Sequence, residues 1–192
     1  EWLVAKASDG EVVIVGLDGA LPNHLLAARV ELRDPEGAWL LAEHVVLDWQ
    51  ALPMLWNRIA IHSLSADKIS LLRRPPARST ASQTTPRIDI STLSLPNIAL
   101  APSLVGHPAI LTAHGSLHYV SRHDISADIT VTRAGSTDNY AAQGAIVSDI
   151  ANGKLAVTEG PDGLLGKLIG FPGLSPVNLR ATAAGNRDSN TL

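Results

Sequence analysis

Apolar residues recur at every second position in many short segments of this chain, and this spacing constrains the fold most strongly. In residues 124–132, DISADITVT, isoleucine, alanine and valine alternate without exception with Asp, Ser and Thr. Weaker alternation occurs in residues 29–33, 44–49 and 177–182. Successive side chains of a β-strand point to opposite faces of the sheet, so this period indicates strands with one apolar and one polar face.

One such segment is present twice. Residues 58–65 read RIAIHSLS, and residues 87–94 read RIDISTLS. Over 58–71 and 87–100, seven of fourteen positions are identical. Internal repetition indicates that one kind of structural unit is used more than once. We therefore expect both copies to form the same strand with the same apolar face.

Turn-forming residues separate these segments. Asp-Gly, Asn-Gly and Asp-Pro-Glu-Gly sequences occur at 18–19, 152–153 and 34–37. Short amphipathic strands separated by such turns favour an all-β, antiparallel protein over βαβ units. The apolar face of the sheet must then either be covered or be a binding surface.

Two segments depart from the strand pattern. Residues 73–87, RRPPARSTASQTTPR, contain three prolines and four arginines but no acid, and this composition predicts an exposed, mobile loop. Residues 162–170 predict a short amphipathic helix, with apolar i,i+4 pairs on one side and Phe-Pro-Gly after it. Residues 52–56 form a second candidate helical turn. The apolar residues of the 162–170 helix are Leu164, Leu165, Leu168 and Ile169.

Composition limits the function. The net charge is −3, so the chain lacks the basic field of a nucleic-acid-binding protein. It contains 45% hydrophobic but only 4% aromatic residues, and it has no cysteine. The apolar surface is therefore aliphatic, and disulfides and thiol chemistry are excluded. No apolar run approaches the roughly 20 residues that span a bilayer. The absence of an initial Met suggests a fragment of a longer protein.

Motifs of catalysis and metal binding occur only in unsuitable contexts. His114 and His118 have a helical ligand spacing, but their surroundings indicate a strand. Ser65 and Lys68 match the S-x-x-K pattern of acyl-enzymes, which requires a helix. Residues 160–167 have the wrong glycine spacing for a phosphate-binding loop. We therefore expect neither an enzyme nor a bound cofactor or metal.

Several segments, taken in order, resemble the TamB family, which comprises the inner-membrane component of the translocation and assembly module. The similar segments of the N-terminal half are LDGAL at 17–21, DPEGAWL at 34–40, LDW at 47–49, RIAIHSLSA at 58–66 and RRP at 73–75. Those of the C-terminal half are LPNI at 95–98, GPDGLLGKLIGFPG at 160–173 and PVNL at 176–179. The family belongs with the AsmA-like, bridge-like lipid transfer proteins.

This resemblance implies a periplasmic protein of a Gram-negative bacterium, anchored in the inner membrane by a segment outside this sequence. Residues 1–192 would form one elongated module of a curled, taco-like β-sheet with an apolar groove. The family is linked to phospholipid movement and outer-membrane protein assembly. Its implied partners are phospholipid acyl chains, neighbouring β rungs and an Omp85-type outer-membrane protein that engages a region absent here.

The inward aliphatic residues of the expected strands are the candidate groove wall. They are Val45, Leu47, Ile59, Ile61, Ile88, Ile90, Ile125, Ile129, Val131, Val177 and Leu179. The helix at 162–170 would plug or line one end of the groove, or else cap an open sheet. The same residues would equally suit the dry core of a closed β-sandwich, acting as a spacer or protein-binding module without lipid. Periodicity alone leaves both alternatives open.

Overall fold

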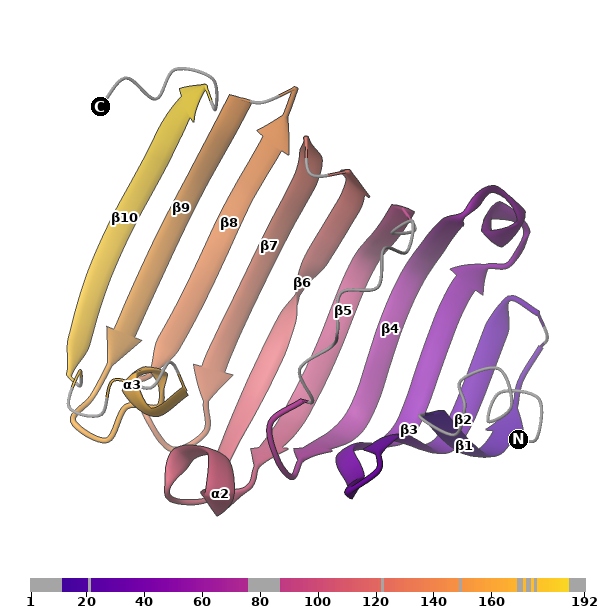
Figure 1. Cartoon of the computed structure of the whole chain (residues 1–192), viewed down its shortest axis with the longest axis horizontal. Helices are drawn as coiled ribbons and strands as arrows, with labels where there is room; N and C mark the ends of the chain where they lie inside the picture. Colours follow the sequence, from indigo (N-terminus) through magenta and orange to yellow (C-terminus); the bar gives the residue numbers. More distant parts are fainter. Residues whose placement is uncertain are drawn as a thin grey trace.

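The computed structural model of the protein describes residues 12–20, 22–75, 87–121, 123–148, 150–168, 171, 174 and 176–186. These residues form one ten-stranded sheet in which each strand neighbours the next along the chain (Figure 1). The sheet is curved and does not close, since β1 and β10 lie at its two edges. The sequence prediction of an all-β, curled sheet is confirmed.

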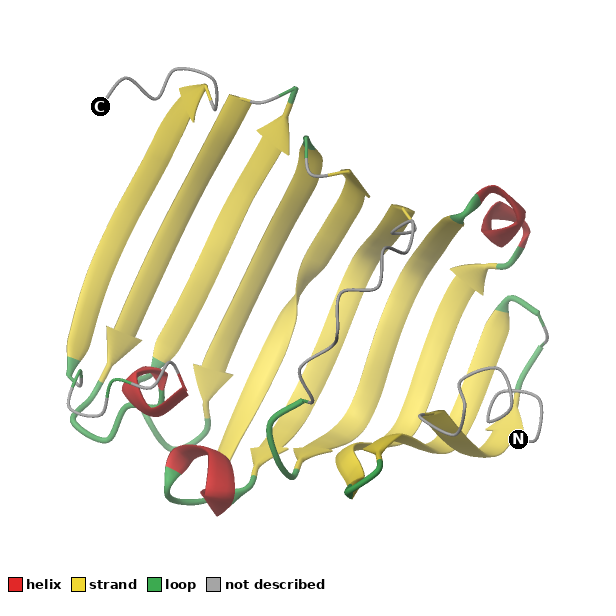
Figure 2. Ribbon diagram, viewed as in Figure 1, coloured by secondary structure: helices red, strands yellow, loops and turns green. Residues whose placement is uncertain are grey.

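The strands are long and are joined mostly by short turns (Figure 2). They are β1 (Val12–Asp18), β2 (His24–Asp34), β3 (Gly37–Gln50), β4 (Arg58–Leu71), β5 (Arg87–Leu100), β6 (Ala109–Ser121), β7 (Asp124–Arg133), β8 (Asn139–Val147), β9 (Ile150–Glu159) and β10 (Val177–Asn186). Three short helices interrupt them: the 3-10 helix η1 (Leu52–Trp56), α2 (Pro102–Val105) and α3 (Leu165–Leu168). The turn predicted at residues 52–56 is confirmed.

One strand pair departs from the predicted antiparallel arrangement. All neighbouring strands run antiparallel except β4 and β5, which run parallel. A parallel pair needs a connection that returns the chain to the starting end of the first strand. Here that connection is residues 72–86, so the Pro- and Arg-rich segment has a topological role that its composition does not indicate.

The two copies of the sequence repeat are this parallel pair. Arg58 lies opposite Arg87, and the register continues to Leu71 opposite Leu100. All seven identical pairs are direct partners across the two strands. The repeat therefore places like side chains beside one another, as the expectation of a shared apolar face requires.

Extra residues in β5 explain why the repeat departs from strict alternation. Its apolar positions fall at 88, 90, 93, 95, 98 and 100, so the spacing alternates between two and three residues. The register between β5 and β6 shifts at Ile90/Leu93 and again at Leu95/Ile98. Each shift adds one residue to β5, as in a β-bulge, and returns the next apolar side chain to the same face.

A small closed core lies at one end of the sheet, beneath α2 and α3. Its buried members are Leu100, Leu104, Val105, Ala109 and Leu164, with Leu71, Ile98 and Leu111 packed against them. α3 is shorter than the predicted helix, because it spans only Leu165–Leu168, and Ile169 and Gly170 lie outside the described residues.

The predicted loop 73–87 is anchored at both described ends. The Arg73 guanidinium binds the Asp34 carboxylate, and its Nη2 donates a hydrogen bond to the Gly37 carbonyl at 2.6 Å. Hydrogen bonding to Arg73 lowers the pKa of Asp34. Arg87 already belongs to β5. Arg73 is thus half-buried rather than exposed, and Arg87 is exposed but belongs to a strand rather than to a loop. Residues 76–86 lie outside the described part of the chain, so the prediction of a mobile loop is not tested there.

Candidate lipid-binding face

All eleven candidate wall residues lie on one face of the sheet, which we call the apolar face. Residues directly opposite each other in neighbouring strands share a face. Ile61 is thereby aligned with Trp49 in β3 and with Ile90 in β5. Ile90 is aligned with Leu117, and Leu117 with Ala127 of β7. One row of side chains thus runs from β3 to β7.

Parallel rows extend the apolar face from β2 to β10. One row joins Leu25, Leu47, Leu64, Leu93, Gly115, Ile129, Ala142, Leu155 and Ala181. A second joins Leu95, Ala113, Val131, Tyr140, Val157 and Leu179. A third joins Ile59, Ile88, Tyr119, Ile125, Ile146 and Ala151. The strands of both halves therefore contribute to one continuous surface.

Sequence analysis missed several members of this surface. Leu64, Leu93, Ile69 and Ile98 occupy the same face as the candidates but fall outside strict alternation. The signal that identifies them is the alternating spacing of two and three residues, which the repeat shows twice.

None of the eleven candidate residues is fully buried, and Leu179 is 44% exposed. The described strands form one sheet rather than the two facing sheets of a β-sandwich. Most of the apolar face is therefore not the dry core of a closed sandwich within the described part of the chain. It is a surface on which an apolar partner can lie.

One end of the apolar face is covered by the residues that lead into α3. Leu164 is only 1% exposed and completes the small core. The buried Glu159 carboxylate fixes this segment, because its Oε1 accepts hydrogen bonds from the Leu164 and Leu165 N–H groups, each at 2.7 Å. The Tyr140 hydroxyl donates to the same oxygen. Burial, together with Glu159, raises the pKa of Tyr140.

The helix candidates differ in their burial. Leu165 is half-buried, whereas Leu168 is 42% exposed and does not belong to the core. Ile169 lies outside the described residues. Of the three helix candidates that the structure describes, Leu164 is the one that is fully buried against the end of the sheet.

A second buried carboxylate supports the same end. Asp138 is 3% exposed, and it accepts hydrogen bonds from the Gly160 N–H at 2.9 Å and from Arg133 at 3.0 Å. Burial raises the pKa of Asp138, but hydrogen bonds from Gly160, Ser136 and Arg133 outweigh it and lower the pKa overall. Arg133 also donates to the Asp162 carbonyl at 2.9 Å. The polar network thus holds the covering loop in one position.

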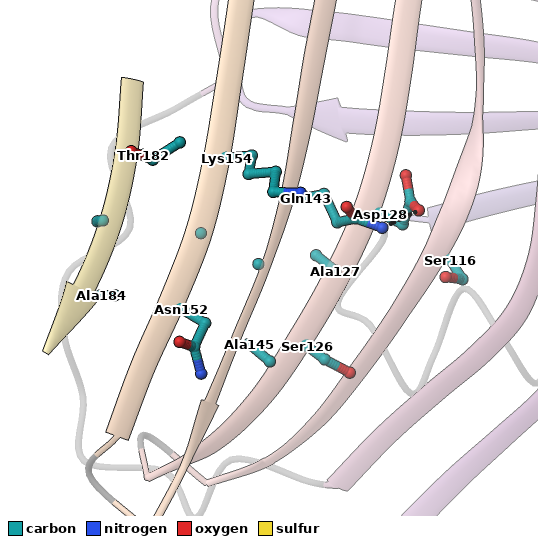
Figure 3. Close-up of a pocket in the computed structure, with 13 residues that line it drawn as sticks. Ser116, Ser126, Ala127, Asp128, Gln143, Ala145, Asn152, Lys154, Thr182 and Ala184 are labelled. Carbon is teal, nitrogen blue, oxygen red and sulfur yellow. Dashed lines mark hydrogen bonds between the residues drawn. The ribbon is translucent and has the colours of Figure 1, made fainter. Parts of the chain in front are cut away.

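A hollow lies on the opposite face of the sheet. It has a volume of about 540 Å³ and is lined by small and polar residues of β6 to β10. Asp128, Gln143, Lys154 and Thr182 form one row across it, and the Gln143 amide donates to Asp128 at 2.9 Å (Figure 3). This hollow is not the predicted aliphatic groove, because none of its lining residues is a candidate wall residue.

The side chains of one Ser, one Asp and one His lie together on the neighbouring strands β4, β3 and β2. The Ser63 hydroxyl donates to Asp48 Oδ2 at 2.8 Å, and His24 Nδ1 contacts the other carboxylate oxygen. These hydrogen bonds, first from His24 and then from Ser63, lower the pKa of Asp48. In a hydrolytic triad the histidine lies between serine and carboxylate. Here the carboxylate lies in the middle, so it gives Ser63 no imidazole base.

The remaining sequence motifs lie on strands. His114 and His118 both belong to β6, and Ser65 and Lys68 both belong to β4, so neither pair has helical geometry. Among the described residues, no group of three or more His, Cys, Asp or Glu side chains is placed to hold a metal ion. The described helices are also too short to span a membrane.

Comparison of the chain with models of protein families, with curated proteins and with solved structures gives no match in any of the three.

Proposed function

We propose that this chain forms part of a hydrophobic conduit for phospholipid acyl chains, as a periplasmic segment of a TamB-like protein. The observation that carries the proposal is the apolar face, on which eleven aliphatic residues from five strands lie together without full burial. Each methylene that a lipid tail buries against such a surface contributes roughly 0.8 kcal/mol. An aliphatic wall of this kind binds acyl chains without recognising their detailed structure.

The location and partners of the proposed conduit come from the family resemblance. In that setting the sheet lies between the inner and outer membranes and supports outer-membrane protein assembly and envelope biogenesis. An Omp85-type protein engages a part of the full-length protein outside this sequence. The open topology supports the proposal because further strands can be added at an unclosed edge to extend the apolar face.

A charge on the apolar face tests the proposal. Ile129→Asp places a carboxylate in the central row, whereas Thr130→Asp places the same charge on the adjacent residue, which faces the other side. The chain and both variants are purified without detergent, and bound lipid is measured by native mass spectrometry and lipid extraction. We expect phospholipid to co-purify with the unmodified chain and with Thr130→Asp but not with Ile129→Asp.

Circular dichroism provides the folding control for these variants. Because Ile129 is only half-buried, we expect the Ile129→Asp variant to retain the sheet. Folded protein without phospholipid in all three samples would contradict the conduit. That result would favour the alternative function, a spacer or protein-binding module with no lipid cargo.

A further inference from the structure

A group of apolar side chains projects from one end of the sheet, at the turn between β3 and β4. Leu52, Met54, Leu55 and Trp56 of η1 are 72%, 51%, 77% and 74% exposed. We call residues 52–56 the apolar tip. Single exposed apolar residues are common on protein surfaces, but contiguous groups of large ones mark interaction sites.

The apolar tip is fixed to the sheet by its backbone. The Asn57 residue that ends η1 has a left-handed conformation, with φ of 57°, and its N–H bonds to carbonyls of Pro53 and Met54. The Asn57 carbonyl accepts a hydrogen bond from the Arg87 N–H at 3.0 Å, and the Ala51 N–H donates to Asn23 Oδ1 at 3.3 Å. The backbone that carries the exposed side chains is thus fixed to the neighbouring strands.

Two arginines lie at the base of the apolar tip. Arg58 and Arg87 are opposite each other at the first positions of β4 and β5, and both are exposed. Arg58 forms an ion pair with Asp89 at 3.3 Å, so the two arginines and this one carboxylate leave a net positive charge at the base of the tip. η1 has no acidic residue in its first turn. The apolar side chains of the tip therefore lie next to the positively charged side chains of Arg58 and Arg87.

A second turn with exposed apolar residues lies at the same end of the strands as the apolar tip. At this end of the sheet, strands β4, β5, β7 and β9 begin and strands β3, β6 and β8 stop (Figure 1). Val147, at the end of β8, is 56% exposed, and Ile150, at the start of β9, is 53% exposed. Two turns separated by several strands thus carry exposed, large apolar side chains at the same end of the strands.

We propose that the end of the sheet that carries the apolar tip docks on a membrane. The tip would insert at the interface of a bilayer that contains anionic phospholipids. Tryptophan favours the boundary between headgroups and acyl chains, where leucine and methionine bury their side chains. Arg58 and Arg87 lie where lipid phosphates would meet the inserted tip, and guanidinium groups bind phosphate well. The positive charge beside the tip, from Arg58 and Arg87 against Asp89, is what an anionic lipid surface would complement. The proposal is independent of whether the apolar face carries lipid.

Vesicle flotation tests the docking. The probes are vesicles of phosphatidylcholine alone and vesicles of phosphatidylcholine with phosphatidylglycerol. The test variant is Trp56→Glu, and the matched control is Phe171→Glu, which changes an aromatic residue of 67% exposure outside the apolar tip. We expect Trp56→Glu to reduce the partition coefficient at least about tenfold and Phe171→Glu to change it less than about twofold.

Two further measurements separate the parts of the proposal. Arg58→Gln/Arg87→Gln should weaken binding to anionic vesicles and reduce its salt dependence, while binding to neutral vesicles stays the same. Ile129→Asp should still bind vesicles even if it loses co-purified lipid, which distinguishes docking from the conduit. Absence of vesicle binding, or equal losses in Trp56→Glu and Phe171→Glu, would overturn the proposal. Retained binding in the folded Trp56→Glu variant would do the same.

Discussion

Ile61 lies directly opposite Ile90 in the parallel pair of β4 and β5, and these two residues are equivalent members of the sequence repeat. The same correspondence holds for the other six identical pairs. Because the two copies lie parallel and in register, each identical side chain stands beside its counterpart on the same face. The repeat is thus explained by the pairing of its own copies.

Engineered disulfides test this register in a chain that contains no cysteine. Ser65 and Ser94 are direct partners, so Ser65→Cys/Ser94→Cys should form an intramolecular disulfide under mild oxidation. Ser65→Cys/Thr92→Cys, displaced by two residues along β5, should form it far more slowly. Non-reducing mass spectrometry measures both products. Faster closure of the displaced pair would contradict the parallel register.

Gly115 permits close contact between β6 and β7. A Cβ atom at this position would lie 2.1 Å from the Asp128 carbonyl oxygen, which is far below any normal contact distance. We expect Gly115→Ala to reduce the free energy of unfolding by roughly 2–4 kcal/mol, since backbone rather than a flexible side chain must move. Chemical denaturation measures the loss.

Gly185→Ala is the control for this substitution. Gly185 lies in the edge strand β10, and a Cβ there would meet no atom within 4 Å. Its change in stability should stay within about 0.5 kcal/mol. Equal stability of the two variants would show that β6 and β7 are not in the close contact described.

Local sequence patterns predict the faces of individual strands well. In β7, Ile125, Ile129 and Val131 lie on the apolar face as their alternation indicates. The prediction is weaker where bulges interrupt the period, because one extra residue moves Leu93 out of phase with Ile90 and a second separates Ile98 from Leu95 by three positions. Leu93 lies within the first eight positions of the repeat, whereas Ile98 is recognised only once the two copies are compared beyond them.

Long-range features were not predictable from the same patterns. The parallel pairing of β4 and β5 depends on which strands become neighbours, and alternation carries no such information. The position of the hollow on the polar side depends on the curvature of the whole sheet around Asp128 and Lys154. Glu159 resembles any charged residue at the end of a strand until the N–H groups of Leu164 and Leu165 lie against it.

Asp138 should make the stability of the protein depend on pH in the acid range. Its pKa is lower in the folded state than its ordinary value of about 3.9, so its contribution is fully present above that value. The contribution is lost as the pH falls through that value towards the folded-state pKa. Denaturation measured between pH 7 and pH 3 should therefore show falling stability in the unmodified chain.

Asp138→Asn removes the titrating group while keeping its size. We expect this variant to be less stable by about 1–3 kcal/mol at pH 7, because Arg133 loses its charged partner. Its stability should then fall less steeply with acid than that of the unmodified chain. An identical acid dependence in the two proteins would show that Asp138 does not contribute.

Leu164 should stabilise the covered end of the sheet more than any other residue of its loop. It is 1% exposed and packs in the core with Leu104 and Val105, so Leu164→Ala should cost about 2–5 kcal/mol through lost contacts and a residual cavity. Leu168→Ala removes the same atoms from a side chain that is 42% exposed, and should cost much less. Thermal and chemical denaturation measure both variants. Equal losses would mean that the predicted helix face, rather than Leu164 alone, covers this end of the sheet.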